Sequence, residues 1–116
     1  MVKLESLKKS YQFKKILKEK KVHSEFFSIF AAKNFYKPKY KEDLIVSFVM
    51  KKKIGNAVKR NKIRRKLKAI VQKLLKKRGA ISKDYTYIVL GKSNAYMQKQ
   101  TVLMPLMEKC FNKIKI

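Results

Sequence analysis

The sequence of 116 residues is poor in the side chains on which most protein active sites depend. It contains seven Asp and Glu residues, one His, one Cys and no Trp. General acid–base catalysis and metal chemistry draw on these side chains, so the composition argues against a self-contained enzyme of either kind. We therefore predict no catalytic residue and no metal ligand in this chain.

Other absences concern the compartment. Cys110 has no second cysteine with which to form an intramolecular disulfide, which fits a reducing environment. The first twenty residues contain no apolar segment of the kind found in secretory signals. No run approaches the roughly 18 apolar residues that a membrane-spanning helix needs. We therefore expect a cytoplasmic protein without a membrane partner.

Glycine and proline are scarce as well, with three and two residues, and no linker rich in Ser, Gly or Pro divides the chain. A chain of 116 residues fits one domain. Because 46% of the residues are hydrophobic, a domain of this size can bury about two-thirds of its unfolded surface. The sequence therefore predicts a single domain over residues 1–116.

Positive charge is abundant instead, with 32 Lys and Arg residues and a formal net charge of +25. Solubility requires a net charge of magnitude only about 2–8, so the excess predicts a polyanionic partner that relieves the repulsion. The basic residues are 28 Lys and 4 Arg, a bias that an AT-rich genome would also produce. The more informative basic residues are therefore the four arginines, Arg60, Arg64, Arg65 and Arg78.

The hydrophobic pattern predicts helices and strands in the order α-β-β-α-β-α. Phe13, Ile16 and Leu17 follow helical spacing, with Ser10 as the cap of that helix. The near-continuous apolar run at 44–50 predicts a strand buried on both faces. The expected helices span 5–20, 57–77 and 102–115, and the expected strands span 25–33, 44–50 and 85–91, with a turn at 34–43 around Pro38. This order implies an α+β fold, a two-layer α/β sandwich with a small mixed sheet.

The charge is concentrated between Lys51 and Arg78, where 14 of 28 residues are basic and none is acidic. The expected helix of this segment has an apolar stripe, and its opposite side carries Asn61, Arg65, Lys68, Gln72 and Lys76. A solvated helix face normally mixes Glu with Lys, and a membrane-surface helix would need the stripe that must cover the strands. We therefore favour a phosphate-binding helix, whose free N-terminal amides add to the attraction.

The stretch KKKIGNAVKRNKIRRKLKAIV at 51–71 resembles the signature of the bacterial ribonuclease P protein component. The resemblance is carried by the blocks 52–58 and 60–65, and so many matched positions are far more specific than a lone glycine motif. It extends loosely over nearly the whole chain, including Phe13 in the first helix and the aromatic strand. Lys59 and Lys66 depart from it by standing where apolar residues are more common, and Lys62 and Lys68 by standing where Arg is common.

The resemblance implies an accessory subunit of an endonuclease that removes the 5′ leader of precursor tRNA. Catalysis would belong to an RNA subunit with Mg²⁺, bound mainly by that RNA. The partners would be the catalytic RNA and precursor tRNA, and we expect the isolated protein to be monomeric. The implied fold is ribosomal-protein-like and contains a left-handed βαβ crossover, against the usual right-handed rule.

The resemblance also implies two RNA-binding surfaces. The residues expected to contact the catalytic RNA are Lys52, Lys53, Asn56, Arg60, Asn61, Lys62, Arg64, Arg65 and Lys68. A cleft between the first helix and the sheet would hold the single-stranded leader, with Phe13, Leu17, Phe30, Lys52 and Arg60 as its lining. Single-stranded RNA binds through aromatic stacking and a basic track. Spacing alone favours the core for Phe13 and Phe30, and only the resemblance places them in the cleft.

Two other classes of protein fit part of the pattern. A ribosomal protein or general RNA chaperone of similar fold would share the charge and the aromatic strands, but it has no reason to carry the 51–68 signature. A protein-only nuclease would need clustered carboxylates for Mg²⁺, which the sequence lacks. His23 is expected at the surface and Cys110 in the core.

Overall fold

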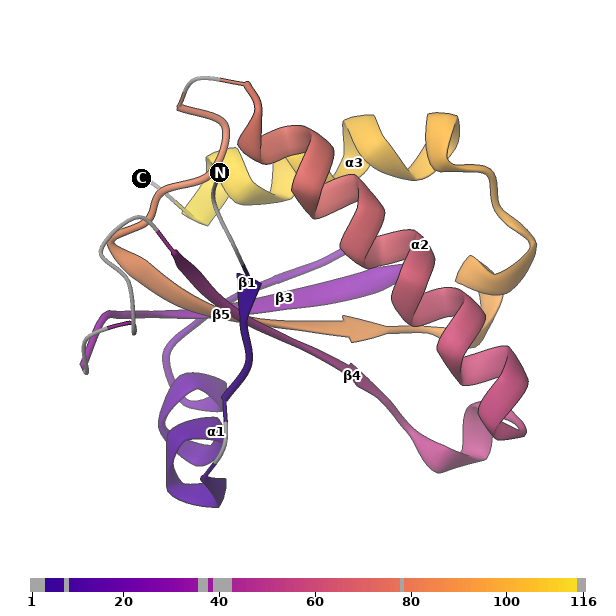
Figure 1. Ribbon diagram of the computed structural model, residues 1–116, viewed down its shortest axis with the longest axis horizontal. Helices are drawn as coiled ribbons and strands as arrows, with labels where there is room; N and C mark the ends of the chain where they lie inside the picture. Colours follow the sequence, from indigo (N-terminus) through magenta and orange to yellow (C-terminus); the bar gives the residue numbers. More distant parts are fainter. Residues whose placement is uncertain (1–3, 8, 36–37, 39–42, 78, 115–116) are drawn as a thin grey trace.

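The structure is a computed structural model that describes residues 4–7, 9–35, 38, 43–77 and 79–114 (Figure 1). The helices are α1 (Ser10–Leu17), α2 (Ala57–Leu75) and α3 (Gln100–Ile114), with short 3-10 helices η1 (Lys52–Ile54) and η2 (Ser93–Met97). The strands are β1 (Leu4–Glu5), β2 (Lys20–His23), β3 (Phe27–Lys33), β4 (Leu44–Met50) and β5 (Tyr85–Gly91).

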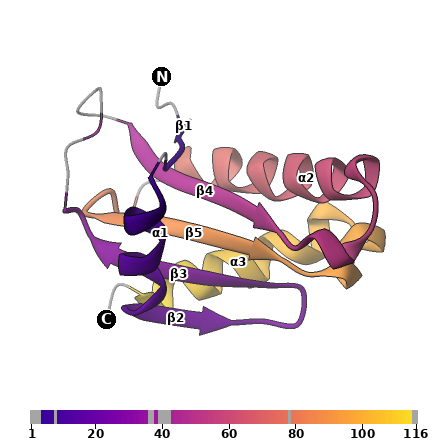
Figure 2. The same cartoon turned by 90° about the horizontal axis from the view of Figure 1, so that it is seen from below.

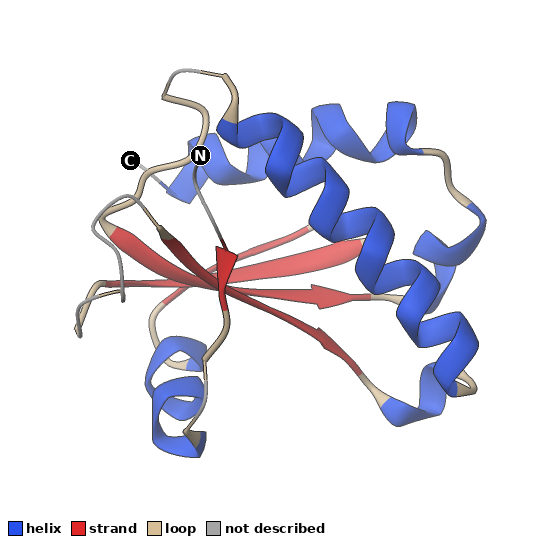
Figure 3. Cartoon of the chain, in the orientation of Figure 1, coloured by secondary structure: helices blue, strands red, loops and turns tan. Residues whose placement is uncertain are grey.

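The five strands form one mixed sheet in the order β1-β4-β5-β3-β2 (Figure 3). β4 runs parallel to both β1 and β5, whereas β3 runs antiparallel to β5 and β2. The six elements predicted from the sequence are present in the predicted order, and the α+β class is confirmed. None of the helices in the described ranges is long and apolar enough to cross a membrane.

The largest difference from the prediction concerns the first helix, which was expected over 5–20 but is confined to Ser10–Leu17. Ser10 is not its cap: the N-cap is Lys9, whose amide donates to Gln12 Oε1 at 3.1 Å. The residues on either side form β1 and β2, which pair with β4 and β3. Neither short strand has an apolar pattern of its own, so tertiary pairing decides their conformation.

The other boundaries differ by a turn or less. α2 ends at Leu75 rather than near residue 77, and α3 spans Gln100–Ile114 rather than 102–115. The expected turn at 34–43 lies largely outside the described residues, as do Lys115 and Arg78.

The core lies mainly between the sheet and the α2–α3 layer, which together form the predicted sandwich (Figure 2). The apolar stripe of α2 is buried there, with Ile63, Leu67, Ile70, Val71 and Leu74 at 0% exposure. α1 packs on the opposite face, where Ile16 contacts a smaller cluster containing Ile45 and Ile88. Most of strand β4 is thus buried on both faces, as its sequence predicts, whereas Phe48 and Val49 are partly exposed.

The crossover from β4 through α2 to β5 is left-handed. In Figure 1 the chain runs to the right along β4, returns to the left along α2 above the sheet, and runs right again along the more distant β5. This path turns counterclockwise as it recedes, which confirms the expectation drawn from the resemblance. The N-terminal turns of α2 consequently lie beyond the carboxyl ends of β4 and β5.

The packing of α2 predicts a sharp contrast between its two faces. Leu67→Ala should lower the free energy of unfolding by about 2–5 kcal/mol, because the lost side chain leaves a cavity in the core between α2 and the sheet. Gln72→Ala, on the exposed face of α2, should change it by less than about 0.5 kcal/mol. Urea denaturation followed by circular dichroism measures both, and equal losses would show that α2 is not packed as described.

Candidate nucleic-acid interface

The start of α2 is a turn held rigidly by its own side chains. Gly55 has φ +152°, a conformation that L side chains rarely adopt, and a Cβ there would approach Lys59 Cδ to 3.0 Å. Asn56 Oδ1 accepts a hydrogen bond from the Lys59 amide at 3.0 Å, as a helix N-cap should. Arg60 Nη1 donates to the carbonyls of Gly55 (2.8 Å) and Lys52 (3.3 Å). The exposed lysines 51–53 are therefore carried on an ordered support.

The outward face of α2 is exposed and basic, as predicted. Asn61, Arg65 and Lys68 are exposed, whereas Arg64 is partly buried and its Nη1 donates to Asn61 Oδ1 at 2.6 Å. Arg65 has no hydrogen bond or ion pair with the part of the chain that the structure describes. Guanidinium groups in this setting are well suited to phosphate oxygens, which they bind in a bidentate manner.

A cleft lies on the other side of the sheet, between α1 and the carboxyl-terminal part of β4. Its volume is about 330 Å³, and it brings together Phe13, Leu17 and Phe30, as predicted. The predicted Lys52 and Arg60 are not among its lining residues. Lys51 lines it instead, one residue earlier in the chain. The cleft is thus apolar, and Lys51 at its rim is the single cation among its lining residues.

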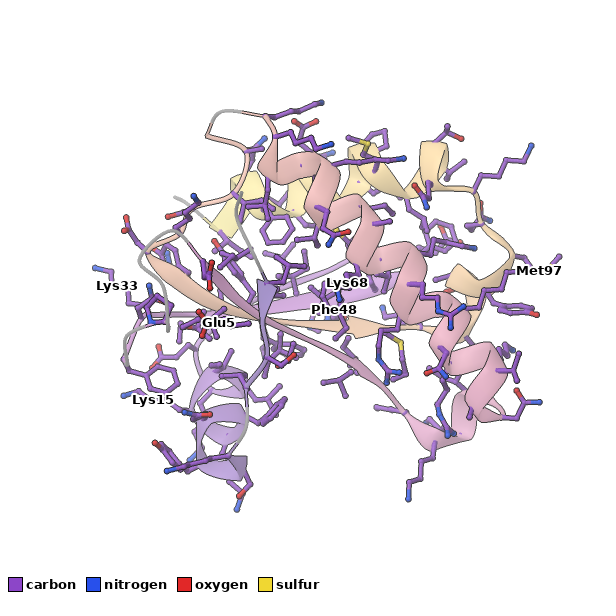
Figure 4. All side chains as sticks on the ribbon, viewed as in Figure 1. Glu5, Lys15, Lys33, Phe48, Lys68 and Met97 are labelled. Carbon is purple, nitrogen blue, oxygen red and sulfur yellow. The ribbon has the colours of Figure 1, made fainter. Side chains whose placement is uncertain are left out.

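A second hollow of about 280 Å³ shares Phe13 and Val49 with the cleft and continues it around the edge of β4. Its lining includes Phe48, Arg64 and Lys68, and Figure 4 shows Phe48 and Lys68 together where α2 crosses the sheet. The two hollows together, which we call the β4 trough, therefore reach from the apolar cleft to the exposed face of α2.

Phe48 was not predicted as a surface residue, because it belongs to a continuous apolar run. It is partly exposed because β1 pairs only with Leu44 and Ile45, which leaves the rest of this edge of β4 without a partner strand in the described chain. The exposure of Phe48 follows from the shortness of β1. A strand of two residues has no recognisable sequence pattern, so this exposure could not be predicted from the sequence.

The opposite flank of α2 holds the connection between β5 and α3. Lys66 Nζ donates to the carbonyls of Ala95 (3.1 Å), Tyr96 (2.8 Å) and Gln98 (2.5 Å). Lys62 Nζ lies 4.7 Å from the centroid of the Tyr96 ring, a cation–π distance. Burial lowers the pKa of Lys66, and the nearby Lys62 charge lowers it further. Lys62, predicted as an RNA contact, thus lies on a different flank from Arg64 and Lys68.

The described residues contain no group of three or more His, Cys, Asp or Glu side chains that could hold a metal ion. Exposed His23 forms a 2.6 Å hydrogen bond through Nδ1 with Ser28 Oγ. Cys110 is buried, and burial raises the pKa of its thiol, which disfavours the nucleophilic thiolate. What this arrangement can do chemically is bind a polyanion on α2 and stack bases in the β4 trough.

The sequence and the fold are similar to those of known proteins. A family model described as Ribonuclease P matches residues 1–115. The ribonuclease P protein component of Mycoplasma capricolum subsp. capricolum is 31% identical over 109 residues, which cover 94% of each chain. That of Mycoplasma mycoides subsp. mycoides is 32% identical over the same length, with the same coverage.

Two solved structures have the same fold. The RNase P protein of Staphylococcus aureus superposes with a TM-score of 0.72, at 24% identity, and the match covers 98% of both chains. The RNase P protein from Thermotoga maritima gives a TM-score of 0.71 at 23% identity, covering 93% of this chain and 96% of the other. Together with the family match and the curated relatives, the signature at the start of α2 leads to one conclusion: the chain belongs to the ribonuclease P protein component family and is a subunit of the ribonuclease P holoenzyme, which processes the 5′ ends of tRNA.

Proposed function

We propose that this chain acts as a single RNA-binding domain that binds the catalytic RNA and the 5′ leader of precursor tRNA at the same time. The observation that carries the proposal is the continuity of the β4 trough with the exposed face of α2. A substrate strand in the trough would lie next to an RNA docked on the helix. The protein would thereby place the leader beside the catalytic RNA.

The catalytic RNA would dock on the signature helix and the turn before it. The proposed contacts are Lys52, Lys53, Asn56, Arg60, Asn61, Lys62, Arg64, Arg65 and Lys68. Within this set, Arg65 and Lys68 are exposed and directed away from the core. Arg60 already donates one nitrogen to the backbone of the turn, so it would contribute its remaining donors and hold the turn in shape.

The leader would lie in the cleft, with its bases on Phe13 and Phe30 and its backbone near Lys51. Leu17, 45% exposed, would extend the apolar wall. Lys52 and Arg60 would also belong to the leader site, as residues behind its rim that attract the leader phosphates at longer range. Stacking on aromatic side chains contributes about 1–3 kcal/mol per base and tolerates sequence variation.

The Mg²⁺ ions of the reaction would be held mainly by the RNA. The described part of the protein offers no carboxylate cluster to bind them, and we assign the protein no step through the metal. Neutralising RNA phosphates with Lys and Arg releases counterions, so the protein would support assembly at cytoplasmic ion concentrations. We propose that it joins the catalytic RNA in the cytoplasm as a monomer.

The docking helix can be tested by reconstitution with a bacterial ribonuclease P RNA at near-physiological Mg²⁺. The wild-type protein should stimulate precursor tRNA cleavage. Arg65→Ala should weaken assembly and reduce the steepness of its log–log salt dependence by about 0.7–0.9, the value of one phosphate contact. Lys109→Ala, which removes one exposed charge from α3, should leave that slope unchanged. Absence of stimulation, with undiminished binding to unrelated RNA, would favour a general RNA chaperone.

The aromatic cleft predicts a difference between substrate and product. Phe13→Ala should weaken holoenzyme binding to precursor tRNA by about 1–3 kcal/mol, the value of one stacked base, and should leave mature tRNA binding unchanged. Tyr11→Ala is the matched control, because Tyr11 is an aromatic residue of α1 that is 58% exposed and does not line the cleft. Equal losses for both forms of tRNA would remove Phe13 from the leader site.

Lys51 and Lys52 are adjacent in sequence but differ in their position relative to the cleft. Lys51→Ala should weaken precursor binding more than mature tRNA binding, because Lys51 lines the cleft and Lys52 does not. Lys52→Ala should weaken both to the same extent through the lost long-range charge. Equilibrium titration of each holoenzyme with the two RNAs measures both ratios, and the reverse pattern would return Lys52 to the rim.

A further inference from the structure

A hollow outside the β4 trough lies at the far end of the sheet, where β3 ends and β5 begins. Its volume is about 450 Å³, within the range of pockets that hold small organic ligands. Three lysines from three elements surround it: Lys15 of α1, Lys20 of β2 and Lys33 of β3. In Figure 4, Lys15 and Lys33 lie at one end of the molecule and Met97 at the other.

The hollow exists because β2 is short. β2 pairs with β3 only as far as Ala31, so β3 continues past it through Lys33 without a partner on that side. Lys15 of α1, together with Glu19 just beyond the C-terminus of that helix, forms the other wall. Lys15 lies on the side of the helix opposite Phe13 and Leu17, since a spacing of two residues turns a helix by about 200°. α1 therefore separates this hollow from the aromatic cleft.

Its lining combines cations with aromatic rings. Lys15 Nζ lies 4.8 Å from the centroid of the Phe35 ring, and Lys20 Nζ lies 5.4 Å from that of Tyr85. Both rings are partly buried, so each presents a limited surface at the wall of the hollow. This combination suits a nucleotide, because a base can stack on a ring while a phosphate meets the ammonium groups.

The balance of charge and the rigidity of the rim also favour a polyanion. The lining contains three lysines and one carboxylate, that of Glu19, and Lys20 Nζ also donates to the Ile114 carbonyl at 3.1 Å. The side chain of Asn34 is held at both ends, by donation from Nδ2 to the Lys83 carbonyl (2.8 Å) and by acceptance at Oδ1 from Thr86 Oγ1 (2.7 Å). This part of the rim is thus preorganised, which reduces the entropy lost when a ligand binds.

We propose that this hollow is a second subsite for single-stranded RNA, occupied by leader nucleotides upstream of those in the aromatic cleft. The inference rests on the proposed function. The catalytic RNA would dock at the start of α2, at the opposite end of a sheet whose seven-residue strands span about 23 Å (Figure 1). The occupant must therefore be a strand that leads away from the catalytic end, and the leader is that strand.

The path is short enough for a continuous chain. Phe30 of the cleft and Ala32 of the hollow are two residues apart on β3 and lie on the same face of the sheet, the one that α1 covers. The barrier between the two sites is α1, whose eight residues measure about 12 Å along the axis. A leader that leaves the cleft needs only to pass the end of this helix to bring its next nucleotides to Lys15 and Lys33.

The test uses the reconstituted holoenzyme and two precursor tRNAs: one with a leader that ends within the cleft and one extended by several nucleotides. The wild type should bind the long form more tightly. The double variant Lys15→Ala/Lys33→Ala should lose that advantage, and its salt slope on the long form should fall by about 1.4, the value of two single-strand phosphate contacts. Binding of the short form should be unchanged.

Lys99→Ala/Lys109→Ala is the matched control, because it removes two exposed charges that do not line the hollow. It should affect both precursors equally and keep the advantage of the long leader. If the two double variants behave alike, the lysines of the hollow are only solvated charges and the inference is overturned.

A stacking readout tests the rings separately. A fluorescent purine analogue in the upstream leader should be quenched in the wild-type holoenzyme, and Phe35→Leu, which keeps an apolar side chain, should relieve the quenching. Unchanged quenching would remove Phe35 from the subsite. If the proposed function itself is wrong, the wild-type protein will stimulate cleavage of neither precursor. If it stimulates cleavage of both but leader length has no effect on binding, only the upstream subsite is overturned.

Discussion

The packing of α2 on the carboxyl ends of β4 and β5 is the interaction on which the remaining features depend. At Gly91, the last residue of β5, a Cβ would come within 2.5 Å of Met50 Sδ and 2.9 Å of Ile63 Cγ2. The missing side chain lets the second turn of α2 approach the sheet closely. This approach fixes where α2 starts, and hence where its basic face, the turn at Gly55 and the β4 trough meet.

The same packing brings positive charge together in a segment, residues 51–78, that contains no acidic residue. Among the described residues, the ion pair between Lys77 and Glu108 lies just beyond the C-terminus of α2, far from the signature turn. Lys66 is held by backbone carbonyls, and its pKa is lowered by partial desolvation of the ammonium group and, to a smaller extent, by the nearby charge of Lys62. A polyanion on the opposite face would relieve this repulsion, so RNA binding should stabilise the folded chain by linkage.

The sequence was sufficient to predict the elements whose pattern reflects burial. Strands 44–50 and 85–91 and the start of α2 at Ala57 agree with the structure because apolar periodicity and the Asn56 cap are local signals. β1 and β2 could not be predicted, since two and four residues carry no period and their partners are distant in sequence. The lysine at the rim of the cleft could not be predicted either. The chain turns into η1 at Lys52, so Lys51 lines the cleft and Lys52 does not.

The short β1 also explains why the basic and aromatic surfaces can be continuous. A longer β1 would pair with Ser47–Met50 and close the route between the face of α2 and the cleft. An open strand edge normally invites pairing with another chain, and proteins protect such edges with charged side chains. Arg64 and Lys68 lie along this edge and Phe13 lies at its α1 side. The cations proposed to contact RNA would therefore also oppose edge-to-edge association of the free protein, because two copies would bring the same positive charges together. RNA carries the opposite charge, so the open edge discriminates in favour of a nucleic-acid partner.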